Sequence, residues 1–358
     1  MRNVIKRIHF MDQNFVQRKE DHLHFSLNPD SQTSLFAQFD QFDLIHDSMP
    51  ELNLNEVSIR SHFLDSELAT PFFVSGMTAG HENANLINDR IAMMASERGW
   101  IMGVGSQRRE LDSTYEDQAL QKLSIKYPKL KLISNLGLSQ LITLHQNNAF
   151  SKLSKLIEKS GSLMIAIHLN PLQEAIQAEG TPNFKGGLEA LKAWKKISPV
   201  PVMVKETGSG MSEVTFLKLK SLDLFAIDLS GMGGTHWGRI EGLRAKNSSL
   251  TTKMGKTFGE WGVSTVESLL DADQIFKGTS TEIWASGGVR SGLDAAKAIA
   301  MGAQRVGFAQ PVLKAAMESE VALMEFASEM EQGLKISMFC TNSKNLTELN
   351  SSKVKGFR

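Results

Sequence analysis

Eight short apolar segments alternate with helix-like stretches along most of the chain, and this alternation constrains the fold more than any other feature. Each segment has the length of a β-strand and is followed by glycine or a polar loop residue. Near-continuous apolarity is typical of parallel strands that are buried on both faces. The segments are Pro71–Ser75, Gly99–Val104, Lys131–Asn135, Leu163–Leu169, Val200–Lys205, Asp223–Leu229, Glu282–Ser286 and Gln304–Ala309.

The stretches between these segments carry helical signals. Leu86–Arg98 has apolar residues at helical spacing, and Gly292–Met301 is rich in helix formers and stops at Gly302. Eight strand–helix units predict a single (β/α)8 barrel, also called a TIM barrel. An open doubly wound sheet is the structural alternative, but it usually needs fewer units.

We expect three parts in the chain. Residues 1–65 are polar and irregular, and they predict an N-terminal extension with one or two short helices that packs on the barrel. Residues 66–335 form the barrel, and residues 336–358 form a C-terminal tail. A long insertion separates the sixth strand from the helix that follows it, and connections of this length are usually functional.

Composition excludes several classes of protein. Lys+Arg and Asp+Glu both number 39, so the balanced chain has no global attraction to nucleic acid or anionic membranes. Cys340 is the single cysteine, so no intramolecular disulfide forms, which fits a reducing cytoplasm. No apolar run reaches the length of a membrane span, and Met1–Phe10 lacks the apolar core of a signal peptide.

Barrel active sites lie at the carboxyl ends of the strands. Gly287-Gly288 and Gly307–Gln310 follow the seventh and eighth strands, each just before a helix, which predicts a phosphate site. Glycines let backbone N–H groups approach phosphate oxygens, and a helix N-terminus favours negative charge. Gly231–Thr235 either adds donors to the same phosphate or serves as a hinge.

The fourth and fifth strand ends carry the remaining chemistry. Lys205 ends a buried strand, where a lysine either stabilises the charge of a reduced flavin or forms a Schiff base. His168 and Asn170 share one side of the strand if it continues, and Gln173 and Glu174 then fall in the following loop. Glu174 offers one carboxylate to Mg²⁺, which often binds one carboxylate plus substrate phosphates.

Two basic pairs are the candidate anion ligands. Arg108-Arg109 follows the second strand. Arg18-Lys19 contributes only if the N-terminal extension folds over the barrel mouth.

These motifs, in this order, resemble the type 2 isopentenyl-diphosphate delta-isomerase family, which is FMN-dependent. The resemblance runs from Arg18 to about Leu313. The strings HLNPLQE and GVGSQR are specific in combination, whereas the glycine motifs are shared with many FMN barrels. The strings that carry it are Arg18-Lys19 with Asp21-His22, Gly103–Arg108, His168–Glu174, Lys205-Glu206, Gly233–Thr235 and Ser286–Gly292.

The resemblance assigns roles to particular residues. His168, Asn170 and Gln173 would lie at the reacting carbons, and Glu174 would bind Mg²⁺. The substrate diphosphate would be bound by Arg18, Lys19, Arg108 and Thr207, with Gln173 bordering the rest of the substrate. FMN would contact Met77, Thr78, Ala79, Ser106, Asn135, Lys205, Ser230, Thr235, Gly288, Val289, Arg290, Ala309 and Gln310.

The implied reaction is a 1,3-proton shift between isopentenyl and dimethylallyl diphosphate, a step of isoprene biosynthesis. Gln173 is a poor acid or base and Glu174 is committed to the metal, so reduced FMN becomes the candidate acid/base through its N5 atom. The family also implies NADPH as the reductant, a cytoplasmic location, no nucleic-acid or membrane partner, and a homo-oligomer, either a tetramer or an octamer.

Three positions depart from the family pattern: Ala79 replaces a glycine, Met232 is bulkier than expected, and His236 replaces a small residue. An FMN-dependent oxidoreductase of the α-hydroxy-acid oxidase type is the rival interpretation. It needs a catalytic histidine in a late loop, for which His236 is the candidate, but it leaves the HLNPLQE string unexplained. A non-catalytic flavin- or prenyl-phosphate-binding protein is a second rival, and the presence of Lys205, Gln173 and Glu174 argues against it.

Overall fold

The computed structural model describes residues 17–33, 37–77, 82–112, 118–245 and 249–356. Within them, eight parallel strands close into a barrel in the order β10, β11, β4, β5, β6, β7, β8 and β9. Each predicted apolar segment corresponds to one strand, although β6 runs two residues beyond its segment, so the (β/α)8 barrel is confirmed and the open sheet is excluded. The strands are β4 (Phe72–Val74), β5 (Ile101–Gly103), β6 (Lys131–Gly137), β7 (Met164–His168), β8 (Val202–Lys205), β9 (Ala226–Asp228), β10 (Glu282–Ala285) and β11 (Arg305–Phe308).

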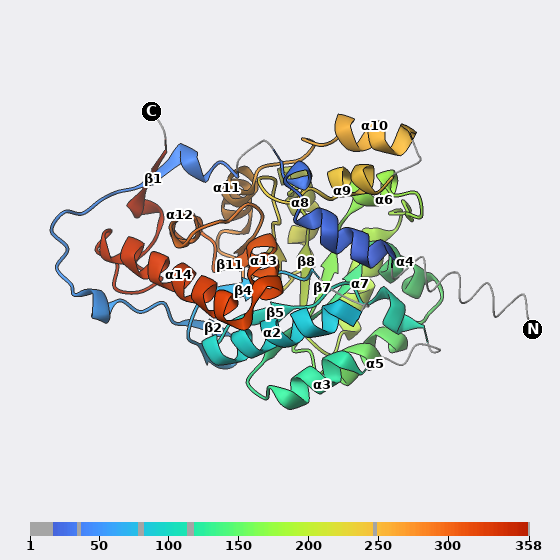
Figure 1. Cartoon of the computed structure of the whole chain (residues 1–358), viewed down its shortest axis with the longest axis horizontal. Helices are drawn as coiled ribbons and strands as arrows, with labels where there is room; N and C mark the ends of the chain where they lie inside the picture. The colour runs from blue at the N-terminus through green and yellow to red at the C-terminus, as the bar shows by residue number, and fades with distance from the viewer. Residues whose placement is uncertain (1–16, 34–36, 78–81, 113–117, 246–248, 357–358) are drawn as a thin grey trace, which may run out of the picture.

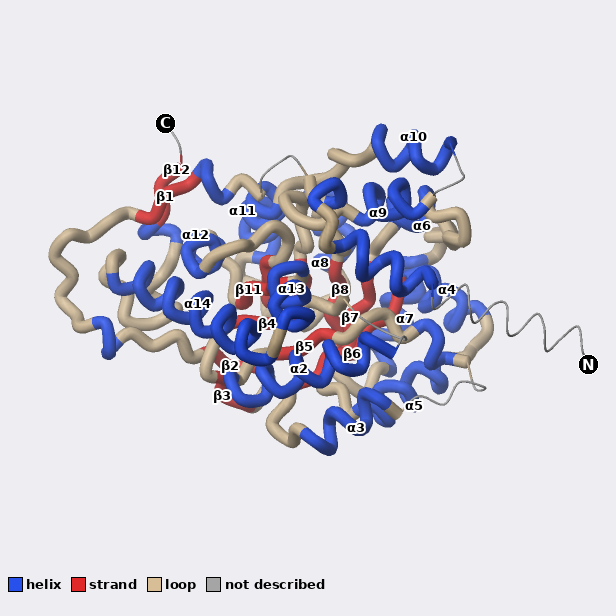
Figure 2. Tube along the Cα trace, in the orientation of Figure 1, coloured by secondary structure: helices blue, strands red, loops and turns tan. Residues whose placement is uncertain are grey.

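Helices surround the barrel, as the ribbon and the tube drawing show (Figures 1 and 2). Both helices that the sequence singles out are present, as α2 and α12. The helices are α2 (Glu82–Arg98), α3 (Ala119–Lys126), α4 (Leu138–Gln146), α5 (Phe150–Ser160), α6 (Pro171–Ile176), α7 (Gly187–Ile197), α8 (Glu213–Lys220), α9 (Trp237–Arg244), α10 (Ser249–Thr257), α11 (Thr265–Phe276), α12 (Gly292–Ala300), α13 (Gln310–Glu318) and α14 (Glu320–Phe339).

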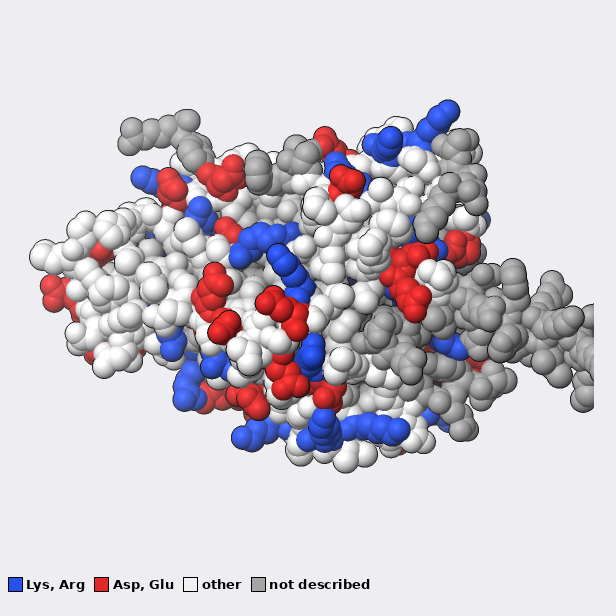
Figure 3. Space-filling model, viewed as in Figure 1, with Lys and Arg blue, Asp and Glu red and all other residues white. Residues whose placement is uncertain are grey.

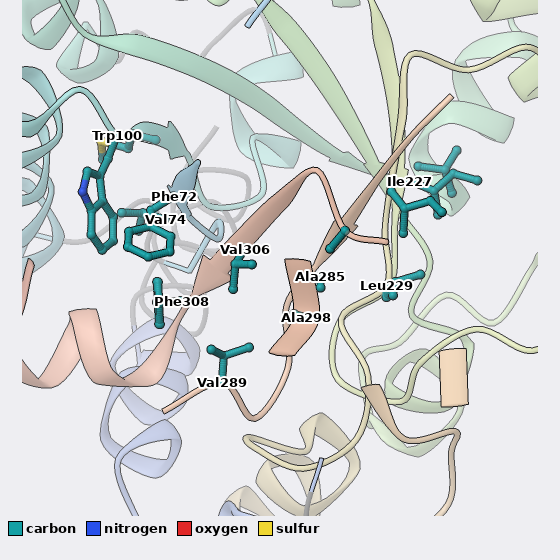
Figure 4. Close-up of a cluster of buried hydrophobic side chains, with 14 of the residues drawn as sticks. Phe72, Val74, Trp100, Ile227, Leu229, Ala285, Val289, Ala298, Val306 and Phe308 are labelled. Atoms are coloured by element: carbon teal, nitrogen blue, oxygen red, sulfur yellow. The ribbon is translucent and has the colours of Figure 1, made fainter. Parts of the chain in front are cut away.

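The barrel sheet is buried on both faces because successive side chains point to opposite sides of a strand. In β4, Phe73 belongs to the cluster inside the barrel, whereas Phe72 and Val74 belong to the cluster between the strands and the helices. Figure 4 shows part of this outer cluster, in which the Trp100 and Phe308 ring centroids lie 5.5 Å apart. Both faces therefore favour the apolar side chains that identify the strands in the sequence.

Two short strand pairs lie outside the barrel, and the sequence gives no signal for them. β2 (Ser61–Phe63) and β3 (Ser66–Leu68) form a hairpin whose Phe63 joins the interior cluster. The guanidinium of Arg305, the first residue of β11, lies 5.4 Å from the Phe63 ring centroid, so the hairpin closes the amino end of the barrel. β1 (Phe42–Leu44) pairs with β12 (Val354–Gly356) and ties the extension to the C-terminal segment.

The expected boundaries do not coincide with the ends of elements. The boundary after residue 65 separates the two strands of the hairpin, and the boundary after residue 335 falls inside α14. Residues 17–26 form a helix, and the short 3-10 turns η1 (Pro29–Ser31), η2 (Phe39–Gln41) and η3 (Leu54–Glu56) follow it. The extension thus contains one α-helix among the described residues, and it is continuous with the barrel.

The long insertion after β9 contains two additional helices. α9 and α10 precede α11, the helix that leads to β10. Basic and acidic side chains are interspersed over the face drawn in Figure 3, in keeping with the zero net charge. In the part of the chain that the structure describes, no helix combines the length and apolarity needed to cross a membrane.

Candidate functional site

One large cavity lies at the carboxyl ends of the barrel strands. Its empty volume is about 1580 Å³, with the open mouth included. The predicted site residues Thr78 and Ala79 lie outside the described residues, and all the other predicted ones line this cavity. These are Arg18, Lys19, Met77, Ser106, Arg108, Asn135, His168, Asn170, Gln173, Glu174, Lys205, Thr207, Ser230, Thr235, Gly288, Val289, Arg290, Ala309 and Gln310.

The loops after β10 and β11 form one side of the cavity, which we call the phosphate side. Gly288 has a positive φ of +71°, and a Cβ atom there would come within 2.7 Å of the Gly233 carbonyl group. The loop that contains Gly233 thus lies against the loop after β10, as the proposal of shared phosphate donors requires. Arg290 borders both loops, because a Cβ atom at Gly234 would come within 3.1 Å of its guanidinium.

The helices α12 and α13 differ at their N-termini. Ser291 and Asp294 form a capping box on α12, so this helix satisfies its own first N–H groups. α13 begins at Gln310 beside the cavity, and its N-cap residue Ala309 makes no side-chain cap bond. An uncapped N-terminus favours an anion such as a phosphate. The α13 end is therefore the better phosphate ligand of the two.

Lys205, the last residue of β8, lines the cavity beside a buried carboxylate. Its Nζ atom lies 3.9 Å from Asp228 Oδ2, and Asp228 Oδ1 accepts a hydrogen bond of 2.6 Å from the Ser286 hydroxyl. Burial raises the pKa of Asp228, while Lys205 and Ser286 act in the opposite direction. Among the described residues, Asp228 Oδ2 has no hydrogen-bond partner. Lys205 therefore lines the cavity with a buried carboxylate behind it.

His168 has a defined tautomer. Asn135 Nδ2 donates to the Val104 carbonyl at 3.0 Å, so Asn135 Oδ1 is the acceptor that lies 2.8 Å from His168 Nδ1. Burial, together with Lys205 and Lys19, lowers the pKa of His168 to about 3. The imidazole is therefore neutral, carries its proton on Nδ1, and has an acceptor lone pair on Nε2.

Gln173 and Glu174 lie in a helix rather than in the expected loop. Pro171 occupies the first turn of α6 and Asn170 is its N-cap residue, so the helix begins as soon as β7 ends. Asn170 Nδ2 donates to Gln173 Oε1 at 3.0 Å and to Glu174 Oε1 at 3.1 Å. The prediction of a loop was wrong, but the rigid helical turn places these side chains together at the cavity wall.

The helix of residues 17–26, which we call the mouth helix, crosses the barrel mouth, where Figure 1 shows it beside α6 and α9. It brings Arg18 and Lys19 into the cavity wall. The extension therefore folds over the barrel mouth, as a contribution from this basic pair requires. Arg108 reaches the same cavity from η4 (Arg108–Leu111). Burial, with the positive charge of Arg18, lowers the pKa of Lys19 to about 8. Three cationic side chains therefore converge on what we call the substrate side.

Glu241 of α9 connects the helix of residues 17–26 to α6 on the substrate side. No pattern in the sequence indicated a role for this residue. Its Oε1 atom accepts hydrogen bonds of 2.9 Å from both His22 Nε2 and Gln173 Nε2, and Arg244 binds its Oε2 atom. Burial pushes the pKa of Glu241 upward, but His22, Arg244 and Gln173 outweigh it and hold this pKa below its ordinary value. Glu241 is thus a buried anion between the mouth helix and α6.

His236 does not line the cavity. It is fully buried, caps α9 through a 3.3 Å bond from Arg239 N to Nδ1, and hydrogen-bonds the Trp261 carbonyl through Nε2 at 3.2 Å. Both ring nitrogens are therefore used in the structure. His236 is not available as the catalytic histidine that the oxidase interpretation needs.

The chain is similar to known proteins over nearly its whole length. A protein of Bdellovibrio bacteriovorus named isopentenyl-diphosphate delta-isomerase is 43% identical over 344 residues, which cover 95% of this chain and 97% of that protein. A protein of the same name from Legionella pneumophila strain Corby is 44% identical, and the match covers 94% of this chain and 96% of that protein. Another from Pyrobaculum aerophilum is 38% identical, and the match covers 93% of each chain. A family model described as FMN-dependent dehydrogenase matches residues 185–356.

Solved structures support the fold. The flavin-binding domain of baker's yeast flavocytochrome b2 superposes with a TM-score of 0.65 at 15% identity, covering 94% of this chain and 79% of that chain. An (S)-mandelate dehydrogenase gives a TM-score of 0.64 at 14% identity, covering 93% and 91%. At such identities the likeness concerns the barrel alone and carries no substrate with it.

Proposed function

The chain belongs to the family of type 2 isopentenyl-diphosphate delta-isomerases, and from this premise we propose that it interconverts isopentenyl diphosphate and dimethylallyl diphosphate by a 1,3-proton shift. One observation carries the proposal. A single cavity joins a glycine-built phosphate side to a substrate side with three cationic side chains. Such a cavity suits a flavin nucleotide and a small diphosphate at the same time.

The residues of the phosphate side fit FMN. The open α13 N-terminus, the Arg290 guanidinium and the glycine loop around Gly288 suit the phosphate group. Lys205, beside Asp228, suits the electron-rich edge of the ring. Reduced FMN would supply an acid/base group at N5.

The chain's own residues bind and orient the substrate. Arg18, Lys19 and Arg108 neutralise the diphosphate, with Thr207 beside them. Binding of the charged end positions a C5 alkene that has no polar group of its own. Gln173 is fixed between Asn170 and Glu241, so its amide presents one defined face to the reacting carbons.

Glu174 and Asn170 fit a magnesium site. Each Glu174 oxygen accepts one N–H group, Oε1 from Asn170 at 3.1 Å and Oε2 from Thr181 N at 2.5 Å, and a carboxylate oxygen keeps a further lone pair. Among the described residues, the buried Asn170 Oδ1 atom has no hydrogen-bond partner. Hard oxygens of this kind, completed by diphosphate oxygens and water, suit Mg²⁺.

A radiolabel assay tests the proposal. Isopentenyl diphosphate is incubated with the protein, FMN, NADPH and Mg²⁺, and each component is omitted in turn. We expect dimethylallyl diphosphate to form without stoichiometric consumption of NADPH, and EDTA or 5-deaza-FMN to abolish turnover. Steady flavin reduction by a 2-hydroxy acid, with no isomerisation, would instead favour the oxidase interpretation.

Further properties belong to the same proposal. NADPH is the proposed reductant, the location is the cytoplasm, and the protein is a homo-oligomer, either a tetramer or an octamer. Measurement of the mass in solution by light scattering distinguishes the tetramer, the octamer and a monomer.

A further inference from the structure

The loop after β8 is wrapped around a buried carboxylate. Glu206 Oε2 accepts hydrogen bonds from four consecutive backbone N–H groups: Thr207 at 2.6 Å, Gly208 at 2.7 Å, Ser209 at 2.5 Å and Gly210 at 3.2 Å. Glu206 is only 5% exposed. Converging N–H groups of this kind form an anion-binding nest, and here a side chain of the same loop fills it.

The nest gives the loop a conformation that ordinary residues do not adopt. Gly208 and Gly210 have φ angles of +135° and +70°, and a Cβ atom would come within 2.5 Å of the Thr235 carbonyl oxygen or 2.3 Å of the Val263 carbonyl oxygen. The loop therefore lies directly on two other segments. Repulsion between the four aligned N–H dipoles would open this turn if no anion were present.

The loop connects the two sides of the cavity. Thr207 and Gly208 line the cavity, whereas Glu206 does not. The Gly210 N–H group donates to the Ser230 carbonyl at 3.1 Å, which fixes the loop to the segment that begins the phosphate side. A shift of the nest would therefore move the Thr207 hydroxyl relative to the other diphosphate ligands.

We infer that Glu206 is a positioning residue, whose carboxylate holds the loop of residues 206–210 so that Thr207 meets the substrate diphosphate. This inference rests on the proposed isomerase function. Because Glu206 is outside the cavity wall, it contacts neither the cofactor nor the reacting carbons. Its loss weakens substrate binding and leaves the FMN site in place.

Removal of the carboxylate and its replacement by a small anion test the inference. Glu206→Ala removes the atoms of one acetate ion and leaves the nest empty. We expect the KM for isopentenyl diphosphate to rise roughly tenfold or more, since a charge-assisted hydrogen-bond set is lost. Added acetate should lower this KM saturably and raise the Tm of the variant, with little effect on the wild-type protein. The dissociation constant of FMN, measured by flavin fluorescence, should stay within about threefold of wild type.

Two conservative variants cover the case in which Glu206→Ala does not fold. Glu206→Gln keeps an acceptor oxygen at the point where the N–H groups converge and loses only the charge, so its KM should rise less than that of Glu206→Asp. Glu206→Asp withdraws the oxygen by one methylene, so its KM should rise. Glu213→Ala, which removes an exposed acid of the adjacent α8, is the matched control and should change neither constant.

The outcomes separate this inference from the proposed function. If wild-type protein does not isomerise, the proposed function fails, but the acetate-dependent Tm of Glu206→Ala still tests the nest. If wild-type protein is active, a wild-type KM in Glu206→Ala, or no response of that variant to acetate, overturns the inference. An equal loss in Glu206→Gln and Glu206→Asp also overturns it, because the position of the acceptor would then not matter.

Discussion

The two sides of the cavity are built in different ways. The phosphate side is built mainly from backbone, with the Arg290 guanidinium added, and its loops after β10 and β11 are separated in the sequence only by α12 and β11. The substrate side consists of long charged side chains, and its central contact joins His22 to Glu241 across 219 positions. A backbone site fails when a side chain fills it, whereas a side-chain network fails when one partner is removed.

The largest effect is expected from filling the backbone site. In Gly288→Ala the new Cβ atom meets the Gly233 carbonyl group at 2.7 Å, and the positive φ adds strain. We expect FMN to bind roughly 100-fold more weakly, a change of about 2.7 kcal/mol, in a fluorescence titration. Gly278→Ala is the control, because Gly278 has φ +77° with nothing within 4 Å of the new atom. Equal losses in both variants would show that strain alone, and not filling of the cradle, weakens FMN.

Removal of the buried anion is the corresponding test on the substrate side. Glu241→Ala leaves His22, Gln173 and Arg244 without their shared partner. We expect kcat to fall on the order of 100-fold, because the amide of Gln173 loses its orientation at the reacting carbons. FMN affinity should be unchanged. A parallel loss of FMN binding would contradict the separation of the two sides, and Glu189→Ala, at an exposed acid of α7, controls for loss of a charge.

The sequence predicts these two sides to different extents. The strands are buried on both faces, so their apolar runs are visible, and Gly288 and Ala309 follow strands whose ends must meet in a barrel. The role of Arg18 depends on where an irregular extension folds, which periodicity does not encode. Glu241 looks like any acid in a helical stretch, because its partners His22 and Gln173 are remote in the sequence. Glu206 stands next to Lys205 in a recognised motif, yet its four bonds come from backbone geometry that residue types do not reveal.

His168 lies between the two sides, and its protonation couples to stability. Its pKa of about 3 lies below the ordinary value of 6.5, so the unfolded chain binds this proton more readily than the folded one. The contribution of the neutral His168 to the free energy of unfolding is complete above pH 6.5 and is lost as the pH falls toward 3. Between pH 7 and 5 the free energy of unfolding should drop by about 2 kcal/mol more in wild type than in His168→Gln. Urea unfolding at both pH values measures this, and parallel curves would show that His168 accepts its proton when folded.

The smallest effect distinguishes the two sides by pH. Lys19 has a pKa of about 8, so above this pH the substrate side loses one positive charge, whereas Arg290 of the phosphate side keeps its guanidinium charge. We expect kcat/KM for isopentenyl diphosphate to fall by about tenfold per pH unit above pH 8, and FMN affinity to stay level. Lys19→Arg should move this decline to higher pH, because a guanidinium keeps its proton there. If kcat/KM declines at the same pH in Lys19→Arg, the decline belongs to the titration of another group. Binding of the diphosphate would then not depend on the charge of residue 19 in the mouth helix.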